Sequence, residues 1–427
     1  MDYLEIKSIL TEQKEDFLNK DEGIIREKLL DVGKYLEGTL AVIISGVRRV
    51  GKSTLLRQVA NKYYDDKDFY YINFEDERLL EFDPKEFNKV LEIMVELYGD
   101  KKVLLIDEIQ NIKSWELFVR RLTDNGYKIF ITGSNADLLS KELGSRLTGR
   151  YIELNLFPFS FPEYLSFNGL NIDLTKTLST IQRAKVIDKY NSYMVEGGIP
   201  ASLKIKDFNF NQTLYQNIVY RDIIARYKIE SEVVIKSIAH HLANNISGLI
   251  AFNKLKQYFH LGSITTVKNY ISYLENAWLF FTVNIYDPSI KRQQIAAKKI
   301  YAIDIGMIRN IGFSFSEKYG QILENNVFLD LKRIFDQIYY YKTHNNLEVD
   351  FYVPAEKLLV QSCYDLNNKE TKQREVEALL QAMKEVKTKR AFILNLKQEE
   401  DLKINGNHIH ILPAYKFLQF LKTKPFN

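Results

Sequence analysis

The chain has 427 residues, of which 46% are hydrophobic and 13% aromatic, and a formal net charge of +4. This composition excludes a disordered protein and predicts two to four folded domains. The longest apolar runs fall short of the ~18 residues that a membrane span needs, and the charged N-terminus is unlike a signal peptide. A single cysteine, Cys363, excludes a disulfide framework, so we expect a cytoplasmic protein with no membrane partner.

The stretch SGVRRVGKSTLL follows an apolar strand and opens an amphipathic helix. Its two glycines, followed by Lys52 and Ser53, fit the P-loop pattern, in which backbone N–H groups and a helix dipole bind a polyphosphate. We expect Lys52 to contact the phosphates of ATP and Ser53 to ligate Mg²⁺. The ATP-binding residues predicted from this loop are Gly46, Val47, Arg48, Arg49, Val50, Gly51, Lys52, Ser53 and Thr54. The two arginines could face either the nucleotide or a neighbouring subunit.

The run VLLIDEIQ, residues 103–110, predicts a buried strand that ends in two acids. Ligands gather at the carboxyl ends of strands in open α/β sheets. We therefore expect Asp107 to hold Mg²⁺ and Glu108 to polarise the attacking water, the step that separates hydrolysis from binding.

Polar residues also follow the next predicted strand, in YKIFITGSNADLL. Ser134 or Asn135 could contact the γ-phosphate as a sensor, or simply cap the following helix. Arg146 and Arg150 come just before a further strand. Each could reach the γ-phosphate of a neighbouring subunit, or form an ordinary surface ion pair.

These motifs, followed by GRYIELNLFPFSFPEYL and EGGIP, resemble the AAA+ superfamily ATPases of bacteria and archaea that carry a C-terminal domain of unknown function. The family is related to the STAND and origin-recognition ATPases. The resemblance implies an ATP- and Mg²⁺-dependent core and a helical lid. It also implies that Pro200, in EGGIP, packs on adenine; the alternative is a turn between two lid helices.

Residues 233–286 predict three helices, the third over 264–277 after a tight turn at Gly262. Two strands of a wing would follow, over 278–286 and 298–306. Residues 246–312 carry eight basic and three acidic side chains, which is typical of phosphate contact by a winged helix. The predicted DNA-binding residues are Thr265, Thr266, Lys268, Asn269, Lys291, Arg292, Lys298 and Lys299. The alternative is a protein-docking domain.

The C-terminal segment predicts a helix that carries Glu324 and then three strands, the second of which carries Asp350. This order resembles the PD-(D/E)XK nuclease core, but Gln361 and Cys363 stand where the family has an acid and a lysine. We expect a degenerate site that does not cut DNA, because the cation is missing. Lys372 and Arg374 are the nearest basic candidates to replace it.

One further motif, NHIHILP, places two histidines on one face of a strand. With no third ligand nearby in the sequence, we expect His408 and His410 to be ordinary strand residues rather than metal ligands.

The predicted fold class is α/β, with a P-loop AAA+ core, a helical lid, a winged helix and a nuclease-like α/β domain. The predicted divisions are 1–38 (helical segment), 39–160 (ATPase core), 161–232 (lid), 233–312 (winged helix) and 313–427 (nuclease-like domain). We expect an ATP-hydrolysing homo-oligomer that remodels branched or forked DNA. The alternative is a STAND-like signalling switch that uses its C-terminal parts for protein docking.

Overall fold

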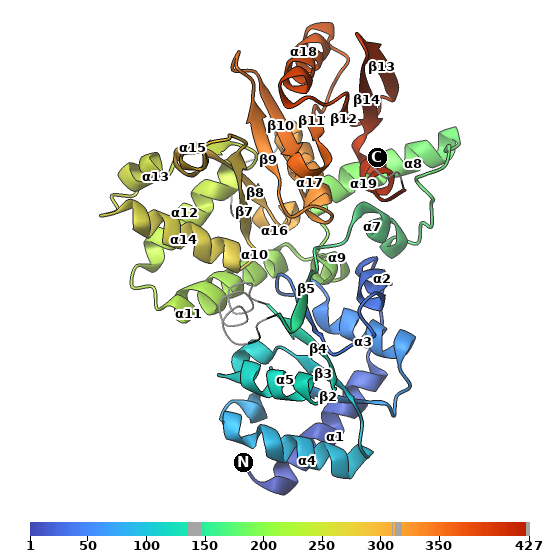
Figure 1. Ribbon diagram of the computed structural model, residues 1–427, viewed down its shortest axis with the longest axis vertical. Coiled ribbons are helices and arrows are strands. Elements are labelled where there is room, and N and C mark those ends of the chain that lie inside the picture. The colour runs from blue at the N-terminus through green and yellow to red at the C-terminus, as the bar shows by residue number, and fades with distance from the viewer. Residues whose placement is uncertain (135–146, 148, 310, 312–317, 424–427) are drawn as a thin grey trace. The chain divides into compact units, whose positions relative to one another are not determined.

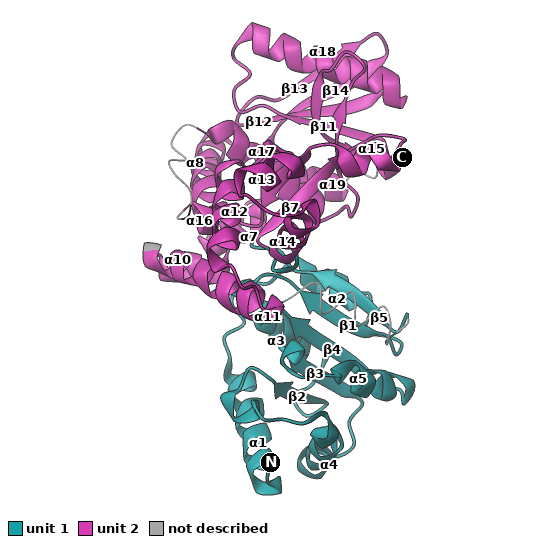
Figure 2. Cartoon of the chain, turned by 90° about the vertical axis from the view of Figure 1, so that its left-hand side faces the viewer, with its two compact units in different colours: residues 1–159, 276–278 teal, residues 160–275, 279–427 magenta. Residues whose placement is uncertain are grey.

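The computed structural model (Figure 1) describes residues 1–134, 147, 149–309, 311 and 318–423. Asn135 and Arg146 lie outside this set. The chain divides into two compact units, one of residues 1–159 and 276–278 and the other of residues 160–275 and 279–427 (Figure 2). In the described part of the chain, no helix combines the length and apolar character that crossing a membrane requires.

The first unit is built on a five-stranded sheet in the order β2-β3-β4-β1-β5, and all neighbouring strands are parallel. The strands are β1 (Ala41–Ser45), β2 (Phe69–Asn73), β3 (Val103–Asp107), β4 (Lys128–Gly133) and β5 (Tyr151–Asn155). β1 and β4 are buried along their whole length, as the continuous apolar runs predict for a parallel sheet covered on both faces. All five carboxyl ends therefore lie at one edge of the sheet.

Helices cover this sheet. They are α1 (Tyr3–Asn19), α2 (Lys28–Gly33), α3 (Lys52–Tyr63), α4 (Phe87–Tyr98) and α5 (Trp115–Asp124), with 3-10 turns at Glu77–Leu79, Pro84–Glu86 and Ile109–Asn111. α1 begins with a capping box, in which Asp2 and Glu5 satisfy each other's backbone N–H groups. Ile6 and Leu10 of this helix are buried in the same core as β2 and β3. The segment predicted as residues 1–38 is therefore part of the first unit.

The second unit contains the remaining helices. They are α7 (Phe161–Phe167), α8 (Thr180–Glu196), α9 (Pro200–Ile205), α10 (Phe208–Asn217), a π-helix (Ile218–Ile224) continued by α11 (Ala225–Tyr227), α12 (Glu232–Asn244), α13 (Phe252–Tyr258), α14 (Ile264–Asn276), α15 (Ile290–Ile295), α16 (Ile305–Ile308), α17 (Tyr319–Lys332), α18 (Lys369–Val386) and α19 (Ala414–Thr423). α12, α13 and α14 match the three helices predicted in the middle of the chain.

The second unit also contains a nine-stranded sheet in the order β13-β14-β12-β11-β10-β9-β7-β8-β6. Its strands are β6 (Leu249–Ile250), β7 (Phe280–Ile285), β8 (Lys298–Ala302), β9 (Tyr339–Lys342), β10 (Glu348–Val353), β11 (Leu358–Ser362), β12 (Arg390–Asn395), β13 (Glu400–Ile404) and β14 (Asn407–Pro413), with a 3-10 turn at Pro354–Glu356.

The two predicted wing strands, β7 and β8, pair antiparallel as a wing requires. β7 pairs in parallel with β9 on its other side, so the sheet continues across the boundary predicted at residue 312. The predicted wing tip contains α15. The sequence did not reveal this continuity, because pairing between distant strands leaves no local pattern.

Helices pack on both faces of the C-terminal part of this sheet. Leu379 and Met383 of α18 are buried against alternate residues of β11, β12 and β14. On the opposite face, Phe417 of α19 packs on Phe392 of β12. α17 lies against β8 and β11. This arrangement brings Glu324 of α17 next to side chains from β8 and β10.

Candidate functional site

The P-loop lies between β1 and α3, at the edge of the sheet where the strands end. Gly46 needs to be glycine because a Cβ there would collide with the Leu156 carbonyl. Arg26 connects the end of the loop at Val50 to the segment after β5. Its guanidinium donates to the Val50 carbonyl at 2.7 Å and to the Phe157 carbonyl at 2.6 Å. Val47 and Val50 are fully buried. The loop conformation is therefore held by packing and hydrogen bonds from several elements.

Lys52 is the first residue of α3 and is almost fully buried. Its ammonium donates to the carbonyls of Gly46 at 3.2 Å and Val47 at 3.3 Å, and lies 3.4 Å from Oε1 of Glu108. Two of its partners are neutral carbonyls. An anionic phosphate would be a stronger partner for this ammonium than either of them.

Asp107 ends β3, and Glu108 follows with left-handed backbone angles, φ 52° and ψ 45°. That conformation is unfavourable for glutamate and is often retained at functional sites. Thr132 of β4 links the two acids, because its hydroxyl donates to Asp107 and accepts from the Glu108 backbone N–H at 3.0 Å. Tyr71 donates to Asp107 at 3.4 Å. Ser53 also hydrogen-bonds to Asp107.

The two acids titrate differently because their surroundings differ. Burial and the charge of Glu108 raise the pKa of Asp107. Burial also acts to raise the pKa of Glu108, but the Lys52 ammonium and the Gln110 amide outweigh it and lower that pKa. Glu108 is therefore a carboxylate at neutral pH.

Oxygen donors of this kind fit a magnesium ion. The Asp107 carboxylate and the Ser53 hydroxyl are hard ligands, and they lie together at the edge where a P-loop holds the phosphates of a nucleotide. These residues would hold Mg²⁺ together with the nucleotide.

Three other site residues predicted in the first unit contact side chains other than Lys52 and Asp107. Ser134 accepts a hydrogen bond from Gln110 at 3.3 Å, so it lies beside Glu108. Arg48 pairs with Glu75 at 3.2 Å. Arg150 pairs with Asp124 at 2.7 Å and precedes β5, so it lies at the end of the sheet opposite the P-loop.

Comparisons with known proteins bear on both units. A family model described as an AAA domain matches residues 39–165, and a domain of unknown function, DUF8612, matches residues 187–317. The uncharacterized protein MJ1544 of Methanocaldococcus jannaschii is 39% identical over 357 residues, which cover 81% of this chain and 79% of that protein. An uncharacterized protein of Haemophilus influenzae is 32% identical, over 68% of this chain and 74% of that protein.

The chain belongs to the family of these two relatives, and its core is an AAA domain. Among solved structures, the RuvB Holliday junction branch migration motor of Thermotoga maritima matches 62% of this chain and 93% of its own, at 15% identity. The TM-score is 0.30. The parallel five-stranded sheet of the first unit is typical of a P-loop AAA+ core.

The EGGIP motif of the AAA protein lies in the second unit, where Gly197 ends α8 and Pro200 begins α9. Asp304 accepts hydrogen bonds from the backbone N–H groups of Gly198 at 2.6 Å and Met307 at 2.9 Å. Gly197 has φ +77°, and a Cβ there would collide with the Asp304 carboxylate. Burial raises the pKa of Asp304 to about 6. The motif thus forms a turn between two helices, and Asp304 holds that turn.

The predicted nucleic-acid face lies mainly on α14. Val267, Ile271 and Leu274 are buried, as the helical period predicts. Thr265, Lys268 and Asn269 are exposed on this helix, and Lys291 and Arg292 are exposed on α15. Thr266 is bound to Ser263 in the cap of α14, and half-buried Lys298 donates to Asn284.

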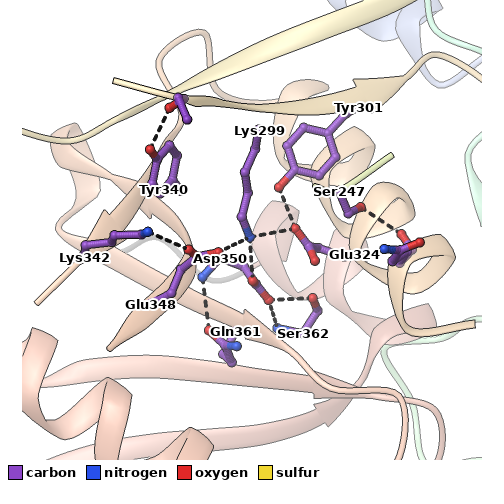
Figure 3. Close-up of polar contacts among 12 residues, drawn as sticks. Ser247, Lys299, Tyr301, Glu324, Tyr340, Lys342, Glu348, Asp350, Gln361 and Ser362 are labelled. Atoms are coloured by element: carbon purple, nitrogen blue, oxygen red, sulfur yellow. Dashed lines mark hydrogen bonds and ion pairs between the residues drawn. The ribbon is translucent and has the colours of Figure 1, made fainter. Parts of the chain in front are cut away.

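Lys299 corrects our interpretation of this face. It is 2% exposed, and its ammonium pairs with Asp350 at 2.8 Å and with Glu324 and Glu348 at 2.9 Å each (Figure 3). An ammonium has three N–H donors, and three carboxylates surround this one. Lys299 therefore does not face DNA; it lies at the centre of the predicted nuclease-like site.

The charges in this cluster depend strongly on one another. Burial acts to lower the pKa of Lys299, but Asp350 and the neighbouring acids outweigh it and raise that pKa well above its ordinary value. Burial and the Asp350 charge raise the pKa of Glu324 to about 8, although Lys299 and Tyr301 oppose this. The lysine is thus charged at neutral pH, and Glu324 is mostly protonated.

The third predicted strand contributes to the cluster differently from our expectation. The Gln361 side chain accepts from the Asp350 backbone N–H at 3.0 Å and donates to Glu375 at 2.8 Å. Ser362 supplies two donors to Asp350, its backbone N–H at 2.9 Å and its hydroxyl at 2.7 Å. Cys363 lies near the Asp365 carbonyl, and burial raises the pKa of its thiol to about 11.

Neither of the basic residues that we considered as substitutes reaches the cluster. Lys372 pairs with Glu400 at 2.6 Å, and Arg374 pairs with Glu375 at 2.6 Å. The prediction that the cation is missing was wrong, because β8, a strand assigned to another domain, supplies it. Only the pairing of distant strands places Lys299 there.

Proposed function

We propose that the AAA domain binds ATP with Mg²⁺ and hydrolyses it. The observation that carries this proposal is the convergence of Lys52, Asp107 and Glu108 at one edge of the parallel sheet. Binding would replace the carbonyl partners of the Lys52 ammonium by phosphate oxygens. Bound Mg²⁺ would offset the negative charge of the phosphates.

The acids have separate roles in this proposal. Asp107 and Ser53 hold the metal. Glu108 does not bind the metal and acts as the base. Thr132 fixes the backbone N–H of Glu108, so the carboxylate is held near the Lys52 ammonium. A carboxylate in this position can accept a proton from the attacking water.

We also propose that the protein acts as a homo-oligomer, in which Arg150 or Arg146 reaches a neighbour's nucleotide. Arg150 precedes a five-residue strand, about 17 Å in length, that runs toward the P-loop edge. It therefore cannot reach its own P-loop and needs a neighbour's. Mixing Arg150→Ala subunits with Lys52→Ala subunits should restore some turnover, whereas full activity of a strictly monomeric protein would contradict the proposal.

We propose DNA, branched or forked, as the partner of α14 and α15. Helices and strands follow one another in the order α12, β6, α13, α14, β7, α15, β8, which is the winged-helix order with a short helix added between the two wing strands. The exposed Lys268, Lys291 and Arg292 supply positive charge, although Arg292 also pairs with Asp287 at 3.0 Å. Short polar side chains beside a lysine on one helix suit contact with a duplex groove.

Turnover of ATP with and without DNA tests the coupling. We expect forked or four-way DNA to stimulate phosphate release by the wild-type protein, and Lys268→Ala to weaken DNA binding and flatten its salt dependence by about one unit. Lys384→Ala, which removes an exposed lysine of α18, is the matched control. Slow turnover that ignores every DNA would favour a signalling switch instead.

We further propose that the C-terminal part does not cleave DNA. Lys299 already pairs with the carboxylates that a catalytic metal would need, and Ser362 donates to the second oxygen of Asp350. Incubation with Mg²⁺ or Mn²⁺ and plasmid DNA should leave the plasmid intact. Nicking that disappears in Asp350→Ala would show that the site is active.

A further inference from the structure

The hairpin of β13 and β14 brings together three side chains that are separated in the sequence. His408 and His410 alternate along β14 and share one face, and Asp401 of β13 lies directly opposite His410. The sequence offered no third ligand beside the two histidines. The structure supplies a candidate third ligand from the neighbouring strand.

The distances are close to those of a metal site. His410 Nδ1 lies 2.6 Å from Oδ1 of Asp401, and His408 Nε2 lies 3.4 Å from the same oxygen. One ligand atom from each residue lies within 4.8 Å of the others. Bonds of about 2.0–2.1 Å in a tetrahedral site place ligand atoms about 3.3 Å apart. Small side-chain rotations would therefore bring all three onto one ion.

One ring nitrogen of the cluster is also left without a hydrogen bond in the described part of the chain. The Nε2 atom of His408 is buried and has no hydrogen-bond partner among the residues that the structure describes. A neutral imidazole nitrogen with a free lone pair binds zinc-class metals.

A groove beside the three side chains has room for an ion, and the lysine that lines it is already paired with an acid. The groove lies beside the hairpin and is lined by Glu399, Glu400, Asp401 and Lys416. Lys416 pairs with Glu399 at 2.7 Å, so its charge is compensated. The Asp401 side chain is 63% exposed, so an ion bound there would face solvent on one side.

We propose that Asp401, His408 and His410 form a binding site for one divalent ion of the zinc class. Two imidazoles and one carboxylate suit Zn²⁺ better than Mg²⁺ or Ca²⁺, which prefer oxygen ligands. Three protein ligands leave at least one coordination position for water or for a side chain of a partner. The site is independent of the ATPase proposal.

The test uses the full chain, freed of metal with a chelator and kept without nucleotide. Titration with Zn²⁺ against a chromogenic competitor should show one site that Asp401→Asn, His408→Ala and His410→Ala each weaken by more than about tenfold, because even outer-shell changes cost 10–100-fold. Co²⁺ should give visible absorption bands in the wild type that the His410→Ala variant lacks.

The matched control is His344→Ala. His344 is 85% exposed and pairs with the single acid Glu385 at 3.0 Å, so its loss should leave Zn²⁺ affinity unchanged. Thermal melts with and without Zn²⁺ show whether each variant is folded, and only the wild type and the control should be stabilised. A wild type that binds no Zn²⁺, or hairpin variants that bind it as tightly, would overturn the proposal.

Discussion

Each unit of the molecule contains a buried lysine beside carboxylates, and the two lysines differ in what else surrounds them. Lys52 contacts two backbone carbonyls and one acid, at 3.2–3.4 Å. Lys299 contacts three acids at 2.8–2.9 Å. We assign Lys52 to a ligand because it contacts neutral carbonyls that a phosphate can replace. Lys299 has a carboxylate at each of its three donors, so we assign it to the stability of the fold.

The comparison predicts the largest loss of folding stability for the substitution Lys299→Met. This variant leaves Asp350 and Glu324, whose side chains are 9% and 13% exposed, without their cation, and losing one partner of a buried ion pair costs about 3–5 kcal/mol. We expect urea unfolding to show that loss. Lys14→Met is the matched control, because Lys14 is equally buried but donates to the Phe69 carbonyl and has a pKa lowered to about 7 by burial.

Should Lys299→Met not fold, Lys299→Met combined with Glu324→Gln and Asp350→Asn removes the opposing charges as well. That triple variant should recover part of the lost stability. If Lys299→Met and Lys14→Met unfold at the same urea concentration, the carboxylates do not depend on Lys299.

A smaller loss of stability is predicted for Lys52→Ala, because Lys52 pairs with one acid, Glu108, and not with three. This variant should weaken ATP binding by about 10–100-fold, since charge-assisted hydrogen bonds contribute about 1.5–3 kcal/mol. Equilibrium binding of a fluorescent ATP analogue measures this. A variant that binds the analogue normally but unfolds easily would reverse the roles that we assign to the two lysines.

The smallest predicted effect is on how the folding stability depends on pH. The pKa of Glu324 is raised to about 8 in the folded protein, so the folded state holds a proton that the unfolded state releases above about pH 4.5. Stability should therefore fall as pH rises from about 4.5 to 8, by at most about 1.4 kcal/mol per unit. Glu324→Gln should flatten this slope between pH 6 and 8. An unchanged slope would mean that Glu324 does not carry the proton.

Local spacing was enough to predict the parallel-sheet core of the first unit and the three helices in the middle of the chain. The P-loop and the acids at the end of β3 are short motifs at strand ends, and α12, α13 and α14 follow a regular helical period. The partners of those motifs were not predictable. Thr132 and Tyr71 reach Asp107 only through the register of β4 and β2, which no local pattern encodes.

The second unit was harder to predict for the same reason. Lys299 and Asp350 are 51 residues apart and meet because β7 pairs with β9. Asp401 meets His410 only across a strand pair. Charge counts placed Lys299 on a DNA-binding face, since composition does not distinguish a buried lysine from an exposed one.

The central claim is that the first unit hydrolyses ATP with Glu108 as its base. The most direct measurement is phosphate release by Glu108→Gln beside its ATP affinity, with Glu77→Gln, an exposed acid of the same unit, as control. We expect Glu108→Gln to bind ATP normally and to turn it over about 10²–10⁴-fold more slowly, with Glu77→Gln unchanged. Phosphate release by Glu108→Gln at the wild-type rate would contradict the account.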